Sequence, residues 1–176
     1  MFETDRLLLR VPAAHDADAV AQAMADEEVM RFIGLGETRT FAESVAHVES
    51  MRRAWSEDGF GAFIVVRKAD GVTLGHVGLF AWDPTSWRPG IRREIGDDAE
   101  IELGWMLTRD AWGCGYASEA AAGVRDWALR EVRPRRLISL IHPQNVRSMR
   151  VATKIGEHRE TAVTTYLGVS TELWTF

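Results

Sequence analysis

The 176-residue sequence has a single cysteine, Cys114, and only five prolines. One cysteine cannot form an internal disulfide or supply a cysteine metal cluster, and it fits a protein of the reducing cytoplasm. The opening residues, Met1 to Asp5, have neither the basic nor the apolar region of a secretory signal. No later stretch approaches about 18 unbroken apolar residues. We therefore expect a cytoplasmic protein that does not span a membrane and uses no metal.

The sequence also has fewer basic than acidic residues. The chain has 21 Lys and Arg against 26 Asp and Glu, which gives a formal net charge of -5 at pH 7. The basic residues are scattered, and the run of Arg133, Arg135 and Arg136 is too short to neutralise many phosphates, so we expect no nucleic-acid partner. Because no stretch has the composition of a linker, we expect one domain over residues 1–176, large enough to bury roughly 70% of its unfolded surface.

Hydrophobic spacing predicts the elements of the first half of the chain. Thr40 and Glu43 have the spacing of a capping box, so a helix begins after Thr40. The predicted elements are a strand at 6–11, a helix that ends near residue 30, a helix that begins after residue 40, an antiparallel hairpin of strands at 60–67 and 72–80, and a long polar loop at 81–98. Loops of that length are uncommon and often functional.

The second half of the chain contains two successive strand-helix units. Asn145 is a good helix N-cap and Gly156 stands where a C-cap glycine belongs. The predicted elements are a strand at 99–107, a helix at about 115–131, a strand at 137–141, a helix between Asn145 and Gly156, and strands near 158–167 and 169–176. The order β, α, α, β, β, β, α, β, α, β, β predicts an α/β fold with a mixed sheet and no internal repeat.

The residues Gly113-Cys114-Gly115-Tyr116-Ala117-Ser118 lie between an apolar strand and an amphipathic helix. The free N–H groups of such a helix N-terminus favour an anion, and the glycines let it approach the backbone. A P-loop would need a Gly-Lys pair, which occurs nowhere in the chain. A dinucleotide fingerprint would need Gly or Ala at Ser118 and an acidic residue at His142. Two interpretations of this turn are left: an anion site of another kind, or a turn whose glycines serve only steric needs.

Taken as a whole, the chain resembles the GNAT superfamily, in particular its ribosomal-protein N-acetyltransferase-like branch. The resemblance spans nearly all residues. Its motifs are Thr4-Asp5-Arg6-Leu7-Leu8-Leu9-Arg10, Glu28-Val29-Met30-Arg31-Phe32, Gly75-His76-Val77-Gly78-Leu79, Glu102-Leu103-Gly104-Trp105-Met106-Leu107, Trp112 through Ala120, Asn145-Val146-Arg147-Ser148 and Lys154-Ile155-Gly156. The last four are the most specific.

The resemblance implies a mostly antiparallel sheet of about seven strands, splayed between the fourth and fifth, with about four helices. Acetyl-CoA would enter that gap. Gly104 would mark a β-bulge that opens it, or would simply accommodate the neighbouring Trp105. The family usually has Gln or Arg where this chain has Asp110, so we expect Asp110 to face solvent. The acetyl-CoA-binding residues implied are Trp105, Met106, Leu107, Arg109, Gly113, Cys114, Gly115, Tyr116, Ala117, Ser118 and Asn145.

The resemblance also implies two catalytic residues, each with an alternative. Glu102 matches the acidic residue of the family's E-x-G motif and would be the base that deprotonates the amine; Glu100, on the same face, is the other candidate. Ser148 matches the serine of N-x-x-S and would donate a hydrogen bond to the departing sulfur, or would simply sit in the helical turn capped by Asn145.

The expected activity is acetyl transfer from acetyl-CoA to a primary amine in a ternary complex. The acceptor is a protein N-terminus, an amino acid or a small-molecule amine, and a homodimer is compatible with the family. We expect segments 31–40 and 81–98 and the last two strands to approach the acceptor. Ordinary loop packing is the favoured interpretation of Trp82, Trp87, Arg88, Arg92 and Arg93, and an aromatic pocket with a basic rim is the alternative. The alternatives are a non-catalytic acyl-CoA sensor and an interaction domain of the same fold.

Overall fold

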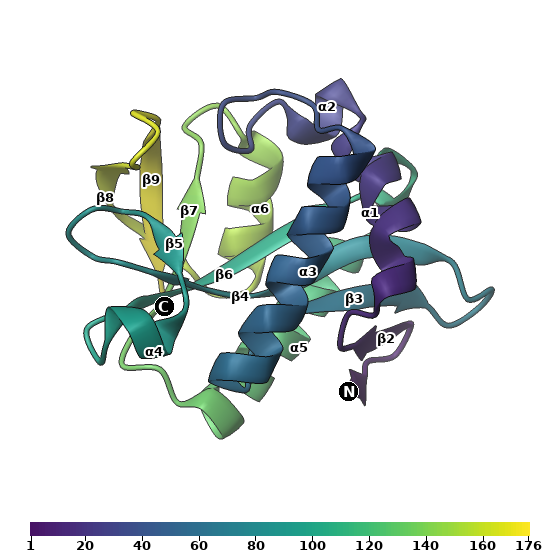
Figure 1. The fold of residues 1–176 in the computed structure, drawn as a ribbon, viewed down its shortest axis with the longest axis horizontal. Helices are drawn as coiled ribbons and strands as arrows, with labels where there is room; N and C mark the ends of the chain where they lie inside the picture. The colour runs from purple at the N-terminus through teal and green to yellow at the C-terminus, as the bar shows by residue number, and fades with distance from the viewer.

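One nine-stranded sheet runs through the protein, and the computed structural model describes all residues 1–176 (Figure 1). Its strands are β1 (Phe2–Glu3), β2 (Leu7–Arg10), β3 (Ala62–Arg67), β4 (Thr73–Trp82), β5 (Pro89–Gly90), β6 (Glu100–Leu107), β7 (Leu137–Ile141), β8 (His158–Thr164) and β9 (Ser170–Thr175). The strand order is β1-β2-β3-β4-β6-β7-β9-β8, and β5 pairs with β4. Without the two-residue strands β1 and β5, the sheet has the seven strands predicted.

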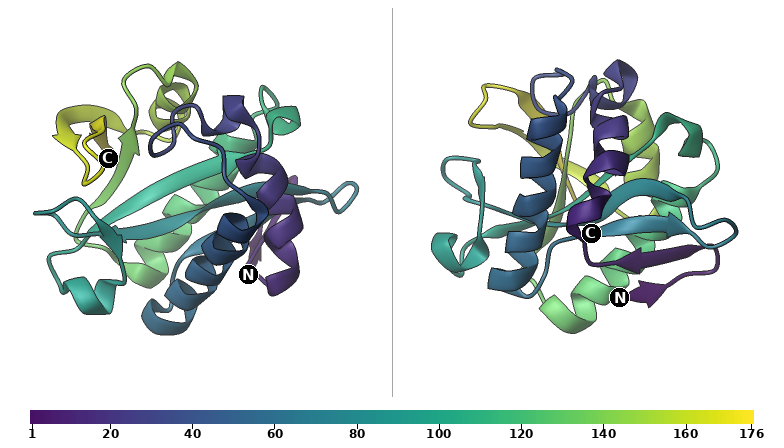
Figure 2. Two further views of the ribbon diagram at one scale, coloured as in Figure 1. Left: turned by 45° about the horizontal axis from the view of Figure 1, so that its top comes forward. Right: turned by 45° about the vertical axis from the view of Figure 1, so that its right-hand side comes forward.

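Helices cover both faces of this sheet (Figures 1 and 2). The helices are α1 (Ala17–Met24), α2 (Glu27–Met30), α3 (Phe41–Asp58), α4 (Arg92–Ile95), α5 (Tyr116–Trp127) and α6 (Val146–Lys154). On one face, α1, α2 and α3 bury residues such as Val20 and Val48 against Ile64 and Met106. On the other face, α5 buries alanines and Val124 in the larger core cluster. Because side chains alternate along each strand, one sheet supplies two apolar surfaces.

The sheet opens between β6 and β7, which form its only parallel pair. The two strands pair only at Ile101 with Leu137 and at Glu102 with Ile138, whereas β6 stays paired with β4 over its whole length. Beyond these pairs, the edge of β6 that faces β7 has no strand partner, although the Ser139 hydroxyl donates a hydrogen bond to the carbonyl oxygen of Leu103 at 2.7 Å. The predicted splay between the fourth and fifth longer strands is confirmed.

Gly104 does not form the predicted β-bulge. Its partner is Gly78, and the register between β4 and β6 continues past it without a shift. A Cβ atom on Gly104 would lie 3.0 Å from the Phe80 ring. The prediction of a bulge was wrong because the glycine accommodates this ring, and the two strands separate without an extra residue.

Local signals placed most elements correctly, with two exceptions. Thr40 and Glu43 form the predicted capping box of α3, and Gly59 ends this helix with a left-handed φ of 73°. The helix predicted to end near residue 30 is instead divided, because Asp26 caps a new turn, α2, by accepting a hydrogen bond from the Glu28 N–H. The loop predicted at 81–98 was too long: β4 extends to Trp82, and β5 and α4 occupy part of the remainder.

Candidate functional site

The glycine turn before α5 has the backbone shape of an anion-binding turn. Gly113 and Gly115 have φ values of 75° and 80°, in the left-handed region that side chains disfavour. Gly115 is the N-cap of α5, and the N–H groups of the first helical turn have no carbonyl partner within the helix. These groups lie on the wall of a pocket and give it a positive electrostatic potential.

The N-terminal residues hold this turn in place. Arg6 donates a hydrogen bond to the Cys114 carbonyl oxygen at 2.9 Å and forms an ion pair with Glu119 at 2.6 Å. The Thr4 hydroxyl donates to the same carboxylate at 2.6 Å. Although burial opposes ionisation, these hydrogen bonds lower the pKa of Glu119, so the contact is charged at neutral pH. Arg6 and Glu119 occur in motifs that carry the family resemblance, but no local signal predicted their contact.

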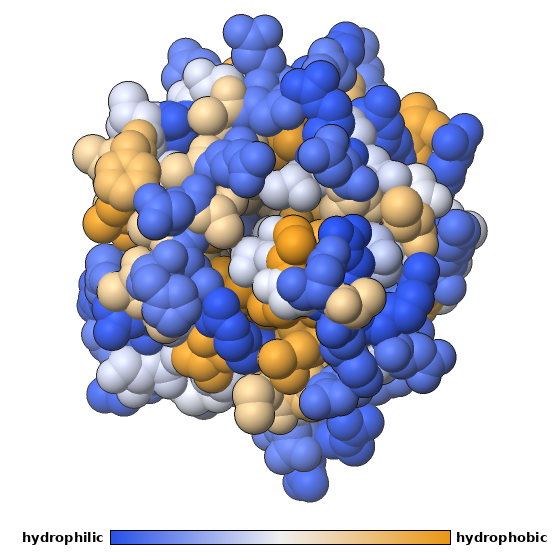
Figure 3. Space-filling model, turned by 90° about the vertical axis from the view of Figure 1, so that its right-hand side faces the viewer, coloured by the Kyte–Doolittle hydropathy of each residue, from blue (hydrophilic) through white to orange (hydrophobic).

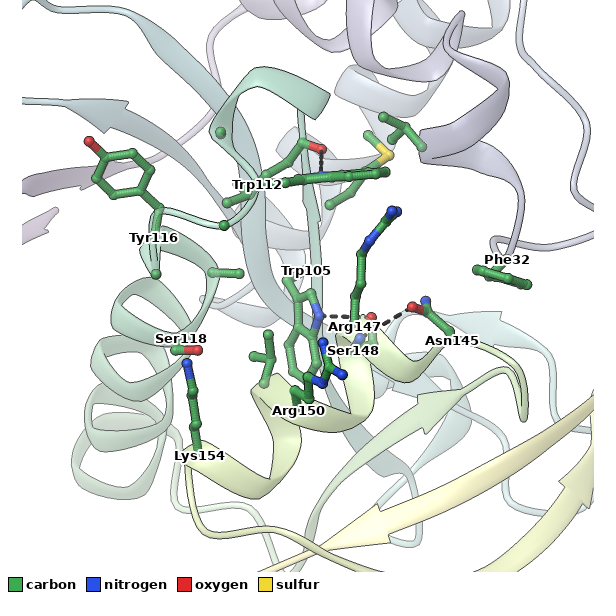
Figure 4. A pocket seen from close by; sticks show the side chains of 18 of the residues that line it. Phe32, Trp105, Trp112, Tyr116, Ser118, Asn145, Arg147, Ser148, Arg150 and Lys154 are labelled. Carbon is green, nitrogen blue, oxygen red and sulfur yellow. Dashed lines mark hydrogen bonds between the residues drawn. The ribbon is translucent and has the colours of Figure 1, made fainter.

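The pocket in front of the turn, here called the first pocket, lies between α5, α6 and the free end of β6 (Figure 4). It is lined by most of the predicted acetyl-CoA-binding residues, namely Trp105, Met106, Leu107, Gly113, Gly115, Tyr116, Ala117, Ser118 and Asn145. Arg109 and Cys114 do not line it. Arg109 is exposed and pairs with Asp26 at 2.5 Å, while Cys114 is exposed and contributes its carbonyl to the contact with Arg6. Asp110 is exposed, as expected.

Three cations on α6 also line the first pocket. Arg147, Arg150 and Lys154 are three and four residues apart and therefore share one helix face (Figure 4). None forms an ion pair within the protein. The Arg147 guanidinium lies 4.3 Å from the centre of the Trp112 ring. Sequence reasoning missed this basic face, although the spacing of the three residues could have indicated it.

Trp105, Asn145 and Ser148 stand where the first pocket meets another. The Ser148 N–H donates to Asn145 Oδ1 at 3.2 Å, so Asn145 caps α6 as predicted. Trp105 Nε1 donates to Ser148 Oγ at 3.1 Å (Figure 4). Because this bond uses a lone pair of the hydroxyl, the Ser148 proton remains available for another acceptor. All three residues also line the neighbouring cavity, here called the second pocket.

Glu102 lies in the second pocket on β6. Trp82 Nε1 donates to Glu102 Oε2 at 2.6 Å. Burial raises the pKa of the Glu102 carboxyl to about 7, although the bonds from Trp82 and the Leu140 backbone favour the ionised form. Glu100 does not line either pocket, and its carboxylate lies 3.7 Å and 3.8 Å from Arg135 and Arg136. Of the two candidate carboxyls, only Glu102 lines one of these two pockets.

A second buried carboxyl, Glu157, lies behind the splay. It is 4% exposed and one of its oxygens lies 2.9 Å from the Ser139 hydroxyl. Burial, with a smaller contribution from the nearby Glu102 carboxyl, raises the pKa of Glu157 to about 7. A folded-state pKa above the ordinary value of 4.5 means that the unfolded chain releases this proton first as the pH rises. The free energy of unfolding therefore decreases with pH between these two values.

We predict that Glu157→Gln removes part of this pH dependence. The variant and the wild type should have similar stabilities near pH 5, where the wild-type carboxyl is protonated. Near pH 8 the variant should be the more stable, because each such group contributes up to about 1.4 kcal/mol per pH unit. Urea unfolding at both pH values measures the difference. An equal change with pH in the two proteins would contradict the prediction.

The three segments expected near the acceptor all contribute to the second pocket. Its wall includes Phe32 and Arg39 from segment 31–40, Pro89 from segment 81–98, and Tyr166 and Thr171 from the end of the chain.

The alternative interpretation, a basic rim from the 81–98 segment, is not found at the second pocket. The backbone N–H groups of Arg92 and Arg93 donate to the Asp58 carboxylate and hold α4 to the end of α3, and the Arg93 guanidinium donates to the Glu57 carbonyl oxygen at 2.7 Å. Arg88 lies 4.7 Å from the centre of the Tyr166 ring. Of the predicted residues, only Trp82 lines the pocket. The favoured interpretation, ordinary loop packing, agrees with these contacts of Arg93 and Arg88.

No helix is long and apolar enough to cross a bilayer. The face shown in Figure 3 is mainly hydrophilic, with hydrophobic groups scattered over it in small patches. Such scattered apolar groups are normal on a protein surface.

Comparisons with known proteins match this chain and its fold to one family. The family model described as Acetyltransferase (GNAT) domain matches residues 6–158. YkkB of Bacillus subtilis (strain 168) is 31% identical over 157 residues, which are 88% of this chain and 83% of YkkB. YnaD of the same organism, named as an N-acetyltransferase, is 29% identical over 157 residues, 89% of this chain and 82% of YnaD.

Solved structures agree with these relatives. An acetyltransferase from Agrobacterium tumefaciens str. C58 has a TM-score of 0.78 at 26% identity, over 99% of this chain and 93% of that one. The ribosomal-protein-S5-alanine acetyltransferase of Vibrio fischeri has a TM-score of 0.75 at 18% identity, over 99% and 94% of the chains. AAC(6')-Ib in complex with ribostamycin and coenzyme A has a TM-score of 0.75 at 17% identity, over 97% and 93%. The chain belongs to the GNAT family of acetyltransferases.

Proposed function

We propose that this protein transfers an acetyl group from acetyl-CoA to a primary amine by direct attack in a ternary complex. The observation that carries the proposal is the meeting of two pockets at Trp105, Asn145 and Ser148. One pocket contains an anion-binding turn, and the other contains a carboxyl whose pKa is about 7. Bound from opposite sides, a thioester and an amine would meet at this junction.

The first pocket fits the chemistry of acetyl-CoA. The backbone N–H groups at the start of α5 suit the pyrophosphate, and the unpaired cations Arg150 and Lys154 suit further phosphate charge. The free edge of β6 beyond Glu102 offers backbone groups to an extended amide-containing arm. Structures such as AAC(6')-Ib, whose complex contains coenzyme A, support this assignment.

Glu102 would remove a proton from the amine. A lysine-like amine of pKa about 10.4 is neutral in only about one molecule in 2,500 at pH 7, so deprotonation limits its attack. A carboxyl with a pKa near 7 is both substantially ionised and basic enough to accept the proton, directly or through water. Ser148, whose proton is free, would donate a hydrogen bond to the departing sulfur.

We predict that replacing both Arg150 and Lys154 by Gln weakens acetyl-CoA binding by about tenfold at low salt. Exposed charges each contribute modestly to phosphate binding, and added salt screens them, so the loss should shrink as the salt concentration rises. Calorimetric titration measures both effects. Arg130→Gln is the matched control, because this exposed arginine lies outside the first pocket. Equal affinities for the double variant and the wild type would remove these cations from the phosphate site.

The acceptor class remains part of the proposal. One protein of similar fold is a ribosomal-protein-S5-alanine acetyltransferase, and another, AAC(6')-Ib, has been solved with ribostamycin. These structures support peptide N-termini and small amines as candidate acceptors. We propose one catalytic domain over residues 1–176, in a monomer or homodimer.

An acceptor screen that follows release of free CoA tests catalysis. The alternative functions are a non-catalytic acyl-CoA sensor or an interaction domain. Binding of acetyl-CoA without CoA release from any amine would favour the sensor. If acetyl-CoA also failed to raise the melting temperature, the interaction domain would be favoured.

A further inference from the structure

Two histidines lie side by side in the wall of the second pocket, on the side away from Glu102. His47 comes from α3 and His76 from β4, and their ring centres are 5.1 Å apart. His76 is 5% exposed. Nδ1 of His76 and Nε2 of His47 are buried, and no protein group forms a hydrogen bond with either atom. Most buried polar atoms in proteins have a partner, so this pair has capacity for a ligand.

The charge of the surroundings restricts what that ligand can be. Burial lowers the pKa of both imidazoles, to about 3 for His76, and therefore keeps them neutral. Arg39, the only Lys or Arg side chain in the wall, lies 3.3 Å from the Glu43 carboxylate. No free cation is left to balance an acceptor carboxylate. No third His, Cys, Asp or Glu joins the pair in a metal-binding group.

A neutral imidazole has one N–H donor and one acceptor nitrogen. Two adjacent neutral imidazoles can therefore donate to and accept from the same hydroxyl or carboxamide, each of which has both kinds of group. Glu43 and Glu102 would not oppose such an uncharged group, as they would oppose a carboxylate.

The strand register gives an approximate spacing between the histidine pair and Glu102 along the floor of the second pocket. His76 pairs with Met106 across the sheet, and Glu102 lies four residues further along β6. At about 3.3 Å per residue, this is about 13 Å along the strand. Between these positions the Phe80 ring lies over Gly104, with its centre 6.4 Å from that of the His76 ring, so this part of the floor is apolar. Allowing about 3 Å for a hydrogen bond at each end leaves about 7 Å, the span of roughly six carbon–carbon bonds.

We propose that His47 and His76 form a specificity subsite that hydrogen-bonds an uncharged polar group, a hydroxyl or a carboxamide, carried on the acceptor about six bonds from its reactive amine. This inference rests on the proposed acetyl transfer, because it takes the second pocket as the acceptor site. It assigns the acceptor to the class of extended amino alcohols and amino amides.

The test is a panel of linear primary amines of graded length, centred on about six carbons, each ending in a methyl, hydroxyl, carboxamide, carboxylate or ammonium group. With acetyl-CoA and the wild-type protein, kcat/KM from CoA release should be at least about tenfold higher for hydroxyl and carboxamide ends than for the methyl end. Equal values for these three ends, or a preference for the carboxylate or ammonium end, would overturn the proposal.

His47→Leu and His47→Gln show whether the histidines cause the preference. Leucine cannot form the hydrogen bonds, so it should reduce the preference for the hydroxyl end about tenfold while kcat/KM for the methyl-ended amine stays within about twofold. Glutamine has a donor and an acceptor and should retain most of the preference. His47 does not line the first pocket, so acetyl-CoA affinity should be unchanged and reports an intact fold. A preference that survives in the leucine variant would contradict the assignment.

The same amines distinguish failure of this subsite from failure of the proposed function. If no amine releases CoA, acetyl transfer to such amines is rejected, and titration of the panel into the protein saturated with CoA then decides on the subsite alone. Tighter binding of hydroxyl- and carboxamide-ended amines, lost in His47→Leu, would support it. Equal binding of all ends, or no binding of any, would overturn it.

Discussion

Glu102→Gln is expected to lower the rate of acetyl transfer at pH 7 by about 10²- to 10⁴-fold, the usual contribution of a general base. The amide cannot accept the proton of the amine, but it has nearly the same shape. Glu102 does not line the first pocket, so the affinity for acetyl-CoA should change little. CoA release and calorimetric titration measure the two quantities separately.

The pKa of Glu102 also predicts how the activity changes with pH. The Glu102 pKa of about 7 belongs to a carboxyl that is protonated, and therefore inactive as a base, below that pH. Wild-type activity should rise with pH through about 7, and this step should disappear in the variant.

Glu100→Gln is the matched control, since Glu100 faces Arg135 and Arg136 rather than a pocket. This variant should keep the wild-type rate of acetyl transfer and the rise of activity with pH through about 7. If the Glu102 variant turned over as fast as the wild type, another group would have to serve as the base.

Gly115→Leu is expected to abolish the stabilisation of the protein by acetyl-CoA. The φ of 80° at Gly115 is disfavoured for a leucine, and the new side chain would cover N–H groups that start α5. In the wild type, acetyl-CoA at about 100 times its Kd should add about 2.7 kcal/mol to the free energy of unfolding, visible as a higher Tm.

Gly59→Leu separates backbone strain from loss of the anion site. Gly59 also has a left-handed φ, of 73°, but it ends α3 and lies outside both pockets. Both variants should lose stability without ligand, by an amount on the order of 1–2 kcal/mol. Only the Gly115 variant should lose the Tm increase with acetyl-CoA. An equal increase in the two variants would show that the turn does not bind the ligand.

The features that the sequence predicted are those with local causes. The glycine turn, the capping box at Thr40 and Glu43, and the Asn145 cap each depend on residues within about one helical turn. The alternation of apolar residues similarly predicts strands, and the motif order of a known family predicted how those strands are arranged. Most of the residues expected at the acetyl-CoA site therefore line one pocket.

The features that the sequence did not predict depend on contacts between distant residues. Arg109 forms its ion pair with Asp26, which is 83 positions away in the sequence. The role of Gly104 depends on the Phe80 ring on another strand. The histidine pair likewise forms because α3 packs against β4. Nothing in the sequence spacing of His47 and His76 indicates that their rings are in contact. Only the folded structure shows which charged groups and aromatic rings already have a partner within the protein.

The contact of Arg6 with Cys114 and Glu119 couples the N-terminal edge of the sheet to the glycine turn. If this contact helps to preform the turn, ligand occupancy and docking of the β1 and β2 edge are thermodynamically linked, and each must favour the other by the same free energy. Amide hydrogen exchange at Leu7 to Arg10 should then slow when acetyl-CoA binds, although these residues lie outside both pockets. The first strands of the chain would thus report on the occupancy of a site more than a hundred residues away in sequence.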